Sequence, residues 1–445
     1  MMKILHYSLG FPPYRSGGLT KFCIDLMNWQ IHEGNVVSLL WPGKMTMINS
    51  SMIKIIRRQS VGNIDSYEVV NPNPVPYDEG IAQVKRFMQS GSLDIYRSFL
   101  KKVDPDIIHF HTLMGLHKEL IEAAKELKIR LVFTTHDFYA MCPRVTLFHN
   151  NSICKDVTDC KLCPECNAHA LSINKIRILQ SPTYRRLKNV PAIQMLRKKH
   201  RDNVLNENNS KTPVDIKSNP SDYQSLREFY YSMIKMMDCI HFNSDIAKKI
   251  YCDFFKDDLP ESAIISITHS MINSNMKIRH YGETIRITYL GAQSTAKGYF
   301  ELRKALDELW SENKNFVLNE IFEPVNNASY INVIGKYTSE QLGDVFDKTD
   351  VLIAPSIWYE TFGYTVIEAL SFGVPVIVSN RVGAMDIIPD GAGIVYDAEN
   401  HNELVSVLRG LNKDTLEKMN RVIVSDYQPL SIAKMNSDIF IHCYL

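Results

Sequence analysis

Two glutamates late in the chain stand eight positions apart, on either side of a phenylalanine and a glycine. Residues 358–370 read WYETFGYTVIEAL, with Glu360 before the glycine and Glu368 in the segment after it. Patterns of buried strands precede and follow this run, at 350–356 and 375–379. In an open α/β sheet, ligands bind beyond the carboxyl ends of the strands, where a helix N-terminus offers N–H groups to an anion. Glu360 could accept from sugar hydroxyls and Glu368 from a ribose, so the run predicts a sugar nucleotide site.

A lysine follows an earlier strand pattern in the same half of the chain. Residues 285–291 read as a strand that ends at Gly291, and Lys297 and Gly298 stand at the turn into the next helical pattern. Lys297 could neutralise a diphosphate at this turn, and Gly298 would allow the helix to approach closely.

The first half of the chain has polar residues and glycines at equivalent places. Gly17 and Gly18 follow a strand pattern at 3–9, and glycine there lets backbone N–H groups come close to a ligand. His136 ends a strand pattern that begins at Arg130, so its side chain is expected to point into a cleft. Asp137 would fix the tautomer of His136 or cap the next segment. The alternatives are a plain tight turn for the glycines and a structural role for the histidine.

Two more histidines precede His136. His109 and His111 close the strand pattern that begins at Asp106, and we expect them to line the same cleft.

Strand and helix patterns alternate in two separate blocks of the chain. Such alternation is typical of α/β domains with doubly wound parallel sheets. We expect one domain at 1–280 and a second at 281–429, with an insertion at about 142–225 in the first.

Composition limits the classes of protein that the chain can represent. The 445 residues suffice for two or three domains, and 45% hydrophobic and 22% charged residues are ordinary for a soluble globular protein. The net charge of +1 gives no reason to expect a nucleic acid partner. There is no run of 18 apolar residues, and the first residues enter a strand pattern directly. We therefore expect a cytoplasmic protein whose cysteines are reduced or bound to metal.

Five cysteines lie close together in the expected insertion. They are Cys142, Cys154, Cys160, Cys163 and Cys166, and the last three form two overlapping Cys-x2-Cys pairs. In a reducing compartment this spacing favours a tetrahedral structural zinc site over disulfides. Unliganded thiols and an iron–sulfur cluster are the alternatives.

The segment after the cysteines is strongly basic. Residues 167–201 contain nine Lys or Arg and no Asp or Glu, and residues 202–225 are rich in Asn, Ser and Asp. This pattern predicts a basic helical arm followed by a mobile loop. The arm is either a solvated face or a surface that docks on anionic lipid at the inner face of the plasma membrane, where a lipid-linked acceptor would reside.

The glutamate motif resembles that of a known family. Glu-x7-Glu with Phe362 and Gly363 after the first glutamate, followed by Glu-Ala-Leu-x-x-Gly-x-Pro-Val, is similar to the donor site of retaining glycosyltransferases of family 4. The resemblance covers the first 165 residues and those from about 238 onward. It implies the GT-B fold, in which two Rossmann-like domains face each other across a cleft, and a helix at 430–445 that crosses back to the first domain. A variant of the family with His-Asp, Cys-Pro and a downstream cysteine cluster is similar to residues 136–166.

This resemblance implies an activity and a set of site residues. A sugar would move from a nucleoside diphosphate to a hydroxyl of a glycan or lipid-linked acceptor with retained configuration, in cell-surface polysaccharide or glycolipid synthesis. The donor phosphate would receive the acceptor proton, so neither a protein base nor a catalytic cofactor is implied. The residues implied as catalytic are His136, Glu360 and Lys297. Those implied to bind the donor are Gly17, Gly18, Gly291, Lys297, Phe362, Gly363, Tyr364, Thr365 and Glu368.

The chain departs from the family pattern at two places. Ala292 stands where relatives carry a phosphate-binding arginine, so Lys297 acts with backbone amides alone, or Arg15 or Arg381 substitutes. His269 stands where relatives have an Asn-Gly turn. These departures favour one alternative, a non-catalytic relative that binds sugar nucleotides and serves a partner enzyme. Another GT-B enzyme, such as an epimerase, is the other alternative.

Overall fold

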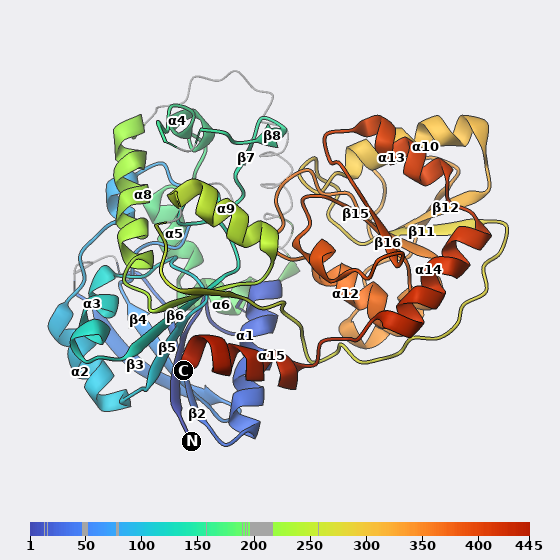
Figure 1. The fold of residues 1–445 in the computed structure, drawn as a ribbon. Helices are drawn as coiled ribbons and strands as arrows, with labels where there is room; N and C mark the ends of the chain where they lie inside the picture. Colours follow the sequence, from blue (N-terminus) through green and yellow to red (C-terminus); the bar gives the residue numbers. More distant parts are fainter. Residues whose placement is uncertain are drawn as a thin grey trace.

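The computed structural model describes most of the chain and places it in two α/β domains (Figure 1). The described residues are 1–445 except 13, 16, 47–51, 77–79, 157, 189, 192, 194, 196–216 and 257. Within them, no helix has both the length and the apolar character needed to cross a bilayer.

The first domain is built on an eight-stranded sheet in the order β10-β9-β6-β5-β1-β2-β4-β3. Its strands are β1 (Lys3–Tyr7), β2 (Val36–Pro42), β3 (Lys54–Val61), β4 (Ile64–Val70), β5 (Ile107–Phe110), β6 (Arg130–Thr135), β9 (Cys239–Phe242) and β10 (Ser262–Ile264). All neighbouring strands are parallel except β3 and β4, which form an antiparallel pair at the edge. Consecutive residues such as Ile107 and Ile108 enter cores on opposite faces, as a parallel sheet covered on both sides requires.

Helices cover both faces of this sheet. They are α1 (Gly18–His32), α2 (Leu93–Val103), α3 (Lys118–Glu126), α8 (Pro220–Ile234) and α9 (Asp245–Phe255), with a 3₁₀ turn η1 (Val84–Phe87). Phe22 and Leu26 of α1 enter one core, and Phe99 of α2 and Leu120 of α3 enter the other.

The expected insertion contains small elements. They are the two-stranded sheet of β7 (Phe148–His149) and β8 (Ser152–Ile153), and the short helices α4 (Cys163–Cys166), α5 (Ile173–Leu179) and α6 (Pro182–Leu187). The loop predicted for 202–225 is wrong at its end, because α8 begins at Pro220. Asn219 and Asp222 cap this helix reciprocally, and Tyr223 is buried.

The second domain has a six-stranded parallel sheet in the order β13-β12-β11-β14-β15-β16. Its strands are β11 (Ile285–Tyr289), β12 (Phe316–Glu320), β13 (Ile331–Val333), β14 (Val351–Ala354), β15 (Val376–Ser379) and β16 (Gly393–Tyr396). Its helices are α10 (Tyr299–Glu312), α11 (Leu342–Asp347), α12 (Tyr364–Ser371), α13 (His401–Arg409) and α14 (Lys413–Asp426), with 3₁₀ turns η2 (Ser339–Gln341) and η3 (Gly383–Ile387). The two doubly wound domains of the predicted fold class are confirmed.

The end of the chain returns to the first domain. Helix α15 (Ile432–Ile439) and the π-helical turn η4 (Phe440–Tyr444) lie beside α1 and the sheet of that domain (Figure 1). Arg130 Nε donates to the carbonyl of Cys443 at 2.8 Å. This returning segment ties the two domains together at the side opposite the insertion.

Candidate active site

A cavity of about 510 Å³ lies between the carboxyl edges of the two sheets. Residues that follow β1, β6 and β9 form its first-domain wall, and residues that follow β11 and β14 form the other. From the predicted set it is lined by Gly18, His136, Gly291, Lys297, Glu360, Phe362, Gly363, Tyr364 and Thr365. Gly17 and Glu368 are not among its lining residues.

The cation and the first carboxylate of the motif meet in this cavity. Lys297 Nζ lies 2.9 Å from Glu360 Oε2 and 5.0 Å from the centre of the Trp358 ring. The side chains of Lys297 and Glu360 are 30% and 16% exposed, so a ligand can reach both. Ser356 Oγ donates to the other oxygen of Glu360 and fixes the carboxylate.

Lys297 is the only lysine or arginine among the described residues that line this cavity. Arg381 donates to the carbonyl of Ile357 and pairs with Glu399, and Arg15 lies 4.9 Å from the Tyr14 ring. Neither arginine lines the cavity, so the structure gives no support to a substitute for the missing arginine at 292.

The N-terminus of α12 adds a second source of positive potential. Gly363 is its N-cap with φ 119°, and a Cβ there would lie 2.9 Å from Val382 Cγ1, so glycine is required. Tyr364 and Thr365 begin the helix and line the cavity. The partial positive charge of the helix therefore faces the same space as Lys297.

Gly18 brings the first domain against this helix. A Cβ on Gly18 would lie 3.0 Å from the Tyr364 ring, so the absence of a side chain permits the close approach of α1 and α12. Gly17 is the N-cap of α1 with φ 112°, a conformation that favours glycine.

His136 lies on the opposite wall. Its Nε2 is buried without a partner among the described residues, and its ring packs edge-on against Phe22 at 4.8 Å. Burial, with a smaller contribution from His241, lowers the pKa of His136 to about 3, so the ring is neutral. Thr361 Oγ1 donates to the backbone carbonyl of His136 at 3.1 Å, which ties this wall to the loop of Glu360.

Asp137 also lines the cavity, and its Oδ1 accepts from the backbone N–H of Tyr139 at 2.9 Å. Of its two expected roles, the structure shows the capping one. Burial raises the pKa of Asp137 to about 6.

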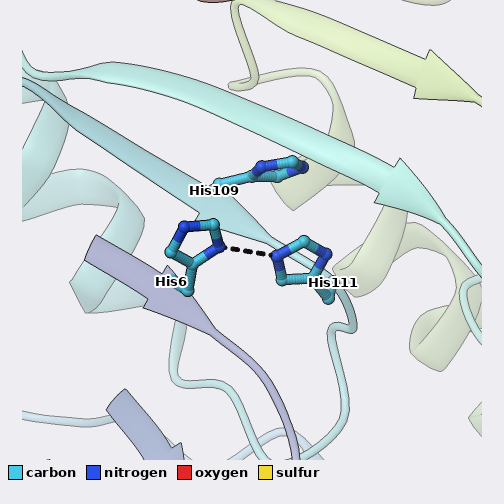
Figure 2. A group of neighbouring side chains, drawn as sticks. All are labelled: His6, His109 and His111. Carbon is cyan, nitrogen blue, oxygen red and sulfur yellow. Dashed lines mark hydrogen bonds between the residues drawn. The ribbon is translucent and has the colours of Figure 1, made fainter. Parts of the chain in front are cut away.

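Three further histidines lie together behind this wall (Figure 2). His6 on β1, His109 on β5 and His111 just after β5 have ring nitrogens within 4.8 Å of one another. The prediction that His109 and His111 line the cleft is wrong, because both are fully buried and neither lines the cavity.

The hydrogen bonds around these histidines have one consistent direction. His241 Nε2 must donate to the carbonyl of Ile265 at 2.7 Å, so its Nδ1 accepts from Thr134 Oγ1, which accepts from His109. His109 then accepts from Tyr444.

The series of hydrogen bonds continues from Tyr444 to Gln30, His6 and His111. The Gln30 amide donates to Tyr444 Oη at 3.1 Å and accepts from His6, which accepts from His111. Every nitrogen except His111 Nδ1 is satisfied when all four rings are neutral. Burial lowers the pKa of each, to about 4 for His6 and His241. The group is therefore a hydrogen-bonded network that needs no metal ion for its polar atoms.

The second glutamate of the motif has a protein partner. Glu368 Oε1 lies 3.0 Å from His269 Nε2, and the His269 ring packs edge-on against Tyr364 at 5.4 Å. His269, the departure from the family turn, thus holds Glu368 beside the cavity.

The five cysteines lie around α4, but their sulfurs do not form a closed site. Among the described residues, the only group of three ligand atoms within 4.8 Å is that of His6, His109 and His111. The thiols of Cys160 and Cys163 are neighbours, and Arg227 donates to Cys163 Sγ at 3.5 Å. A common zinc ion would require the other thiols to move toward this pair.

Part of the basic arm belongs to the folded domain. Arg185 lies 3.3 Å from Glu68, whose side chain is 2% exposed, and 4.2 Å from the Tyr14 ring. Lys188 Nζ donates to the Tyr14 carbonyl at 2.9 Å. These charges are therefore compensated or engaged by the fold. The basic residues at 197–201 lie outside the described residues.

Several polar residues of the cavity were not predicted as site residues, among them Asn243, Ser356 and Thr361. Asn243 follows β9 and lines the cavity beside His136, and neither atom of its amide has a partner among the described residues. The available signal was its place after the buried strand CIHF, at the carboxyl edge of the sheet.

Comparisons with known proteins agree with this geometry. Residues 272–428 match the family described as Glycosyl transferases group 1. The chain is 24% identical over 328 residues to an uncharacterised 42.6 kDa protein in the cps region of Klebsiella pneumoniae. The aligned region covers 73% of this chain and 70% of that protein. It is 30% identical over 100 residues to O-antigen chain mannosyltransferase B of Escherichia coli, and this aligned region covers 22% of this chain and 26% of the relative.

Solved structures show the same architecture over nearly the whole chain. Sucrose-phosphate synthase from Thermosynechococcus elongatus aligns with a TM-score of 0.56 and 13% identity, over 99% of this chain and 97% of that one. HepE of Anabaena in complex with UDP and glucose aligns with a TM-score of 0.53 and 11% identity, over 99% and 98%. The protein is a glycosyltransferase with the GT-B fold. The match to the glycosyl transferases of group 1 lies mainly over its second domain, at residues 272–428.

Proposed function

We propose that the protein transfers a sugar from a nucleoside diphosphate to an acceptor hydroxyl, with retained anomeric configuration. The observation that carries this proposal is the cavity itself, where the Lys297–Glu360 pair and the α12 N-terminus face His136 across the two domains. The relatives in the cps region and the O-antigen mannosyltransferase support a cell-surface polysaccharide or a lipid-linked glycan as the acceptor.

The proposed chemistry follows from the charges in the cavity. Donor diphosphate would compete with Glu360 for Lys297, and Lys297 together with the α12 N-terminus would stabilise the leaving diphosphate. Released from the pair, Glu360 would accept from hydroxyls of the donor sugar. Neutral His136 would contact the sugar from the other domain. The acceptor proton would pass to the departing phosphate on the same face, which retains the configuration.

Two features of this proposal lie outside the cavity. The enzyme would work in the cytoplasm at the inner face of the plasma membrane, where the basic residues at 197–201 would contact anionic lipid. Flotation with anionic but not neutral vesicles at low salt tests this contact, and equal flotation with both would contradict it. We also propose structural zinc at the cysteine cluster, because thiolates are the ligands that zinc favours in such sites.

Incubation of the purified protein with UDP-, GDP- and ADP-sugars tests the function directly. We expect one nucleotide sugar to raise the melting temperature and to be consumed, with release of the nucleoside diphosphate. The described residues that line the cavity include no second cation, which favours one competing function, a binding protein without turnover. Stabilisation by a nucleotide sugar that is never consumed would support that alternative.

A further inference from the structure

Asn243 occupies a defined place on the first-domain wall of the cavity. Strands β6 and β9 are parallel neighbours, and Thr135 pairs with Phe242 at their carboxyl ends. The next residues, His136 and Asn243, therefore leave the two strands at the same level. Both line the cavity.

The amide of Asn243 is unusual because it is buried and unsatisfied. The residue is 1% exposed, yet Oδ1 and Nδ2 both lack a hydrogen-bond partner among the described residues. A buried polar group without a partner is destabilising, and native proteins leave such groups unpaired rarely. Nε2 of His136 also lacks a partner within the described part of the chain, so Asn243 and His136 together present three polar atoms to which the described residues offer no hydrogen bond.

This wall is fixed relative to the carboxylate on the other side. Ser244 Oγ donates to the carbonyl of Thr361 at 2.6 Å, and Thr361 Oγ1 donates to the carbonyl of His136. Thr361 is the neighbour of Glu360. Glu360 and Asn243 line the same cavity, so a sugar that contacts Glu360 lies in the space that the Asn243 residue also borders.

We propose that Asn243 is a specificity-determining residue that binds the donor sugar through two adjacent hydroxyls. Its amide oxygen accepts from one hydroxyl and its N–H group donates to the next, whereas a glutamate offers only acceptors. The substrate class is a nucleotide sugar that presents a vicinal pair of free hydroxyls to this wall. This assignment rests on the proposed function, because it requires a donor sugar in the cavity.

The test separates the sugar from the nucleotide. Calorimetry with wild type, Asn243→Ala and Asn243→Asp compares a nucleoside diphosphate with the corresponding nucleotide sugar, using UDP with UDP-glucose and UDP-galactose, and GDP with GDP-mannose. We expect Asn243→Ala to bind the nucleoside diphosphate as the wild type does, and to bind the nucleotide sugar about tenfold more weakly or worse. Asn243→Asp keeps the volume but loses the donor and adds a negative charge, so it is expected to weaken binding of the nucleoside diphosphate as well, and the decisive quantity is the gain in affinity from the sugar, which should shrink. Asn402→Ala, on the exposed side of α13, is the control and should change neither.

Donors that lack one hydroxyl identify which group Asn243 contacts. The deoxy analogue that removes this contact should bind the wild type about tenfold more weakly than the parent donor, but should bind Asn243→Ala as the parent donor does.

Each outcome has a distinct meaning. No binding of any nucleoside diphosphate by the wild type would contradict the proposed function itself. Normal binding of the nucleoside diphosphate, with the same gain from the sugar in wild type and both variants, would overturn the assignment of Asn243 alone. A wild type for which the sugar adds no affinity would overturn it as well. If Asn243→Ala does not fold, the isosteric Asn243→Asp variant decides.

Discussion

Replacement of Lys297 with alanine tests the electrostatic core of the site. The lysine is the one cation among the described lining residues, so no neighbour can take over its role at the diphosphate. The change also leaves Glu360 as an unpaired carboxylate that is 16% exposed, which opposes the entry of an anion.

The magnitude follows from comparable groups in enzymes. Removal of one preorganised electrostatic contact to a developing charge typically lowers kcat by about 10²–10³. We expect at least a hundredfold loss of donor consumption in Lys297→Ala, which corresponds to about 2.7 kcal/mol of transition-state stabilisation. Glu360→Ala should cost a similar factor through lost contacts to the sugar.

The assay is release of nucleoside diphosphate under saturating donor, with thermal melting as the check of folding. Lys304→Ala on the exposed side of α10 removes the same charge away from the cavity and should keep full activity. Turnover of Lys297→Ala or Glu360→Ala near that of the wild type would refute the assignment of the site.

Three other results are expected. Glu368→Ala should raise the apparent constant for the donor with little change in kcat if this residue holds the ribose, and an unchanged constant would remove that role. The purified protein should contain about one zinc per chain, and Cys163→Ser should lose both the metal and thermal stability, whereas a folded and active metal-free preparation would end this idea. The free energy of unfolding should fall as the pH drops below the ordinary histidine pKa of 6.5, because burial lowers the pKa of His6 and His241 to about 4 and of His136 to about 3. Each of these histidines takes up a proton only on unfolding, which costs about 1.4 kcal/mol per pH unit until the folded pKa is reached, and a urea midpoint that stays constant from pH 7 to pH 5 would contradict this account.

The sequence was sufficient for the architecture and for those site residues that lie on strand ends. Strands such as β5 and β6 are short runs of β-branched and aromatic residues, and their carboxyl ends identify one edge of a sheet without any knowledge of its partners. Lys297 and Glu360 follow β11 and β14, which pair with each other, so local patterns placed them correctly on one wall.

The remainder depended on contacts between distant parts of the chain. Tyr444 completes the histidine network from a position 335 residues after His109, and no local pattern indicates that contact. His269 contacts Glu368 across 99 positions, and no local pattern indicates that partner for the second glutamate. Asn243 has no motif around it, and its importance becomes visible only from the absence of a partner for its amide in the folded protein.

The most direct test of the central claim is an NMR time course of the purified protein with the nucleotide sugar that stabilises it most. We predict release of nucleoside diphosphate and transfer or hydrolysis in which the first anomer formed matches the donor, with this signal lost in Lys297→Ala. A first product of the opposite anomeric configuration, or a tightly bound donor that is never consumed, would contradict a retaining glycosyltransferase.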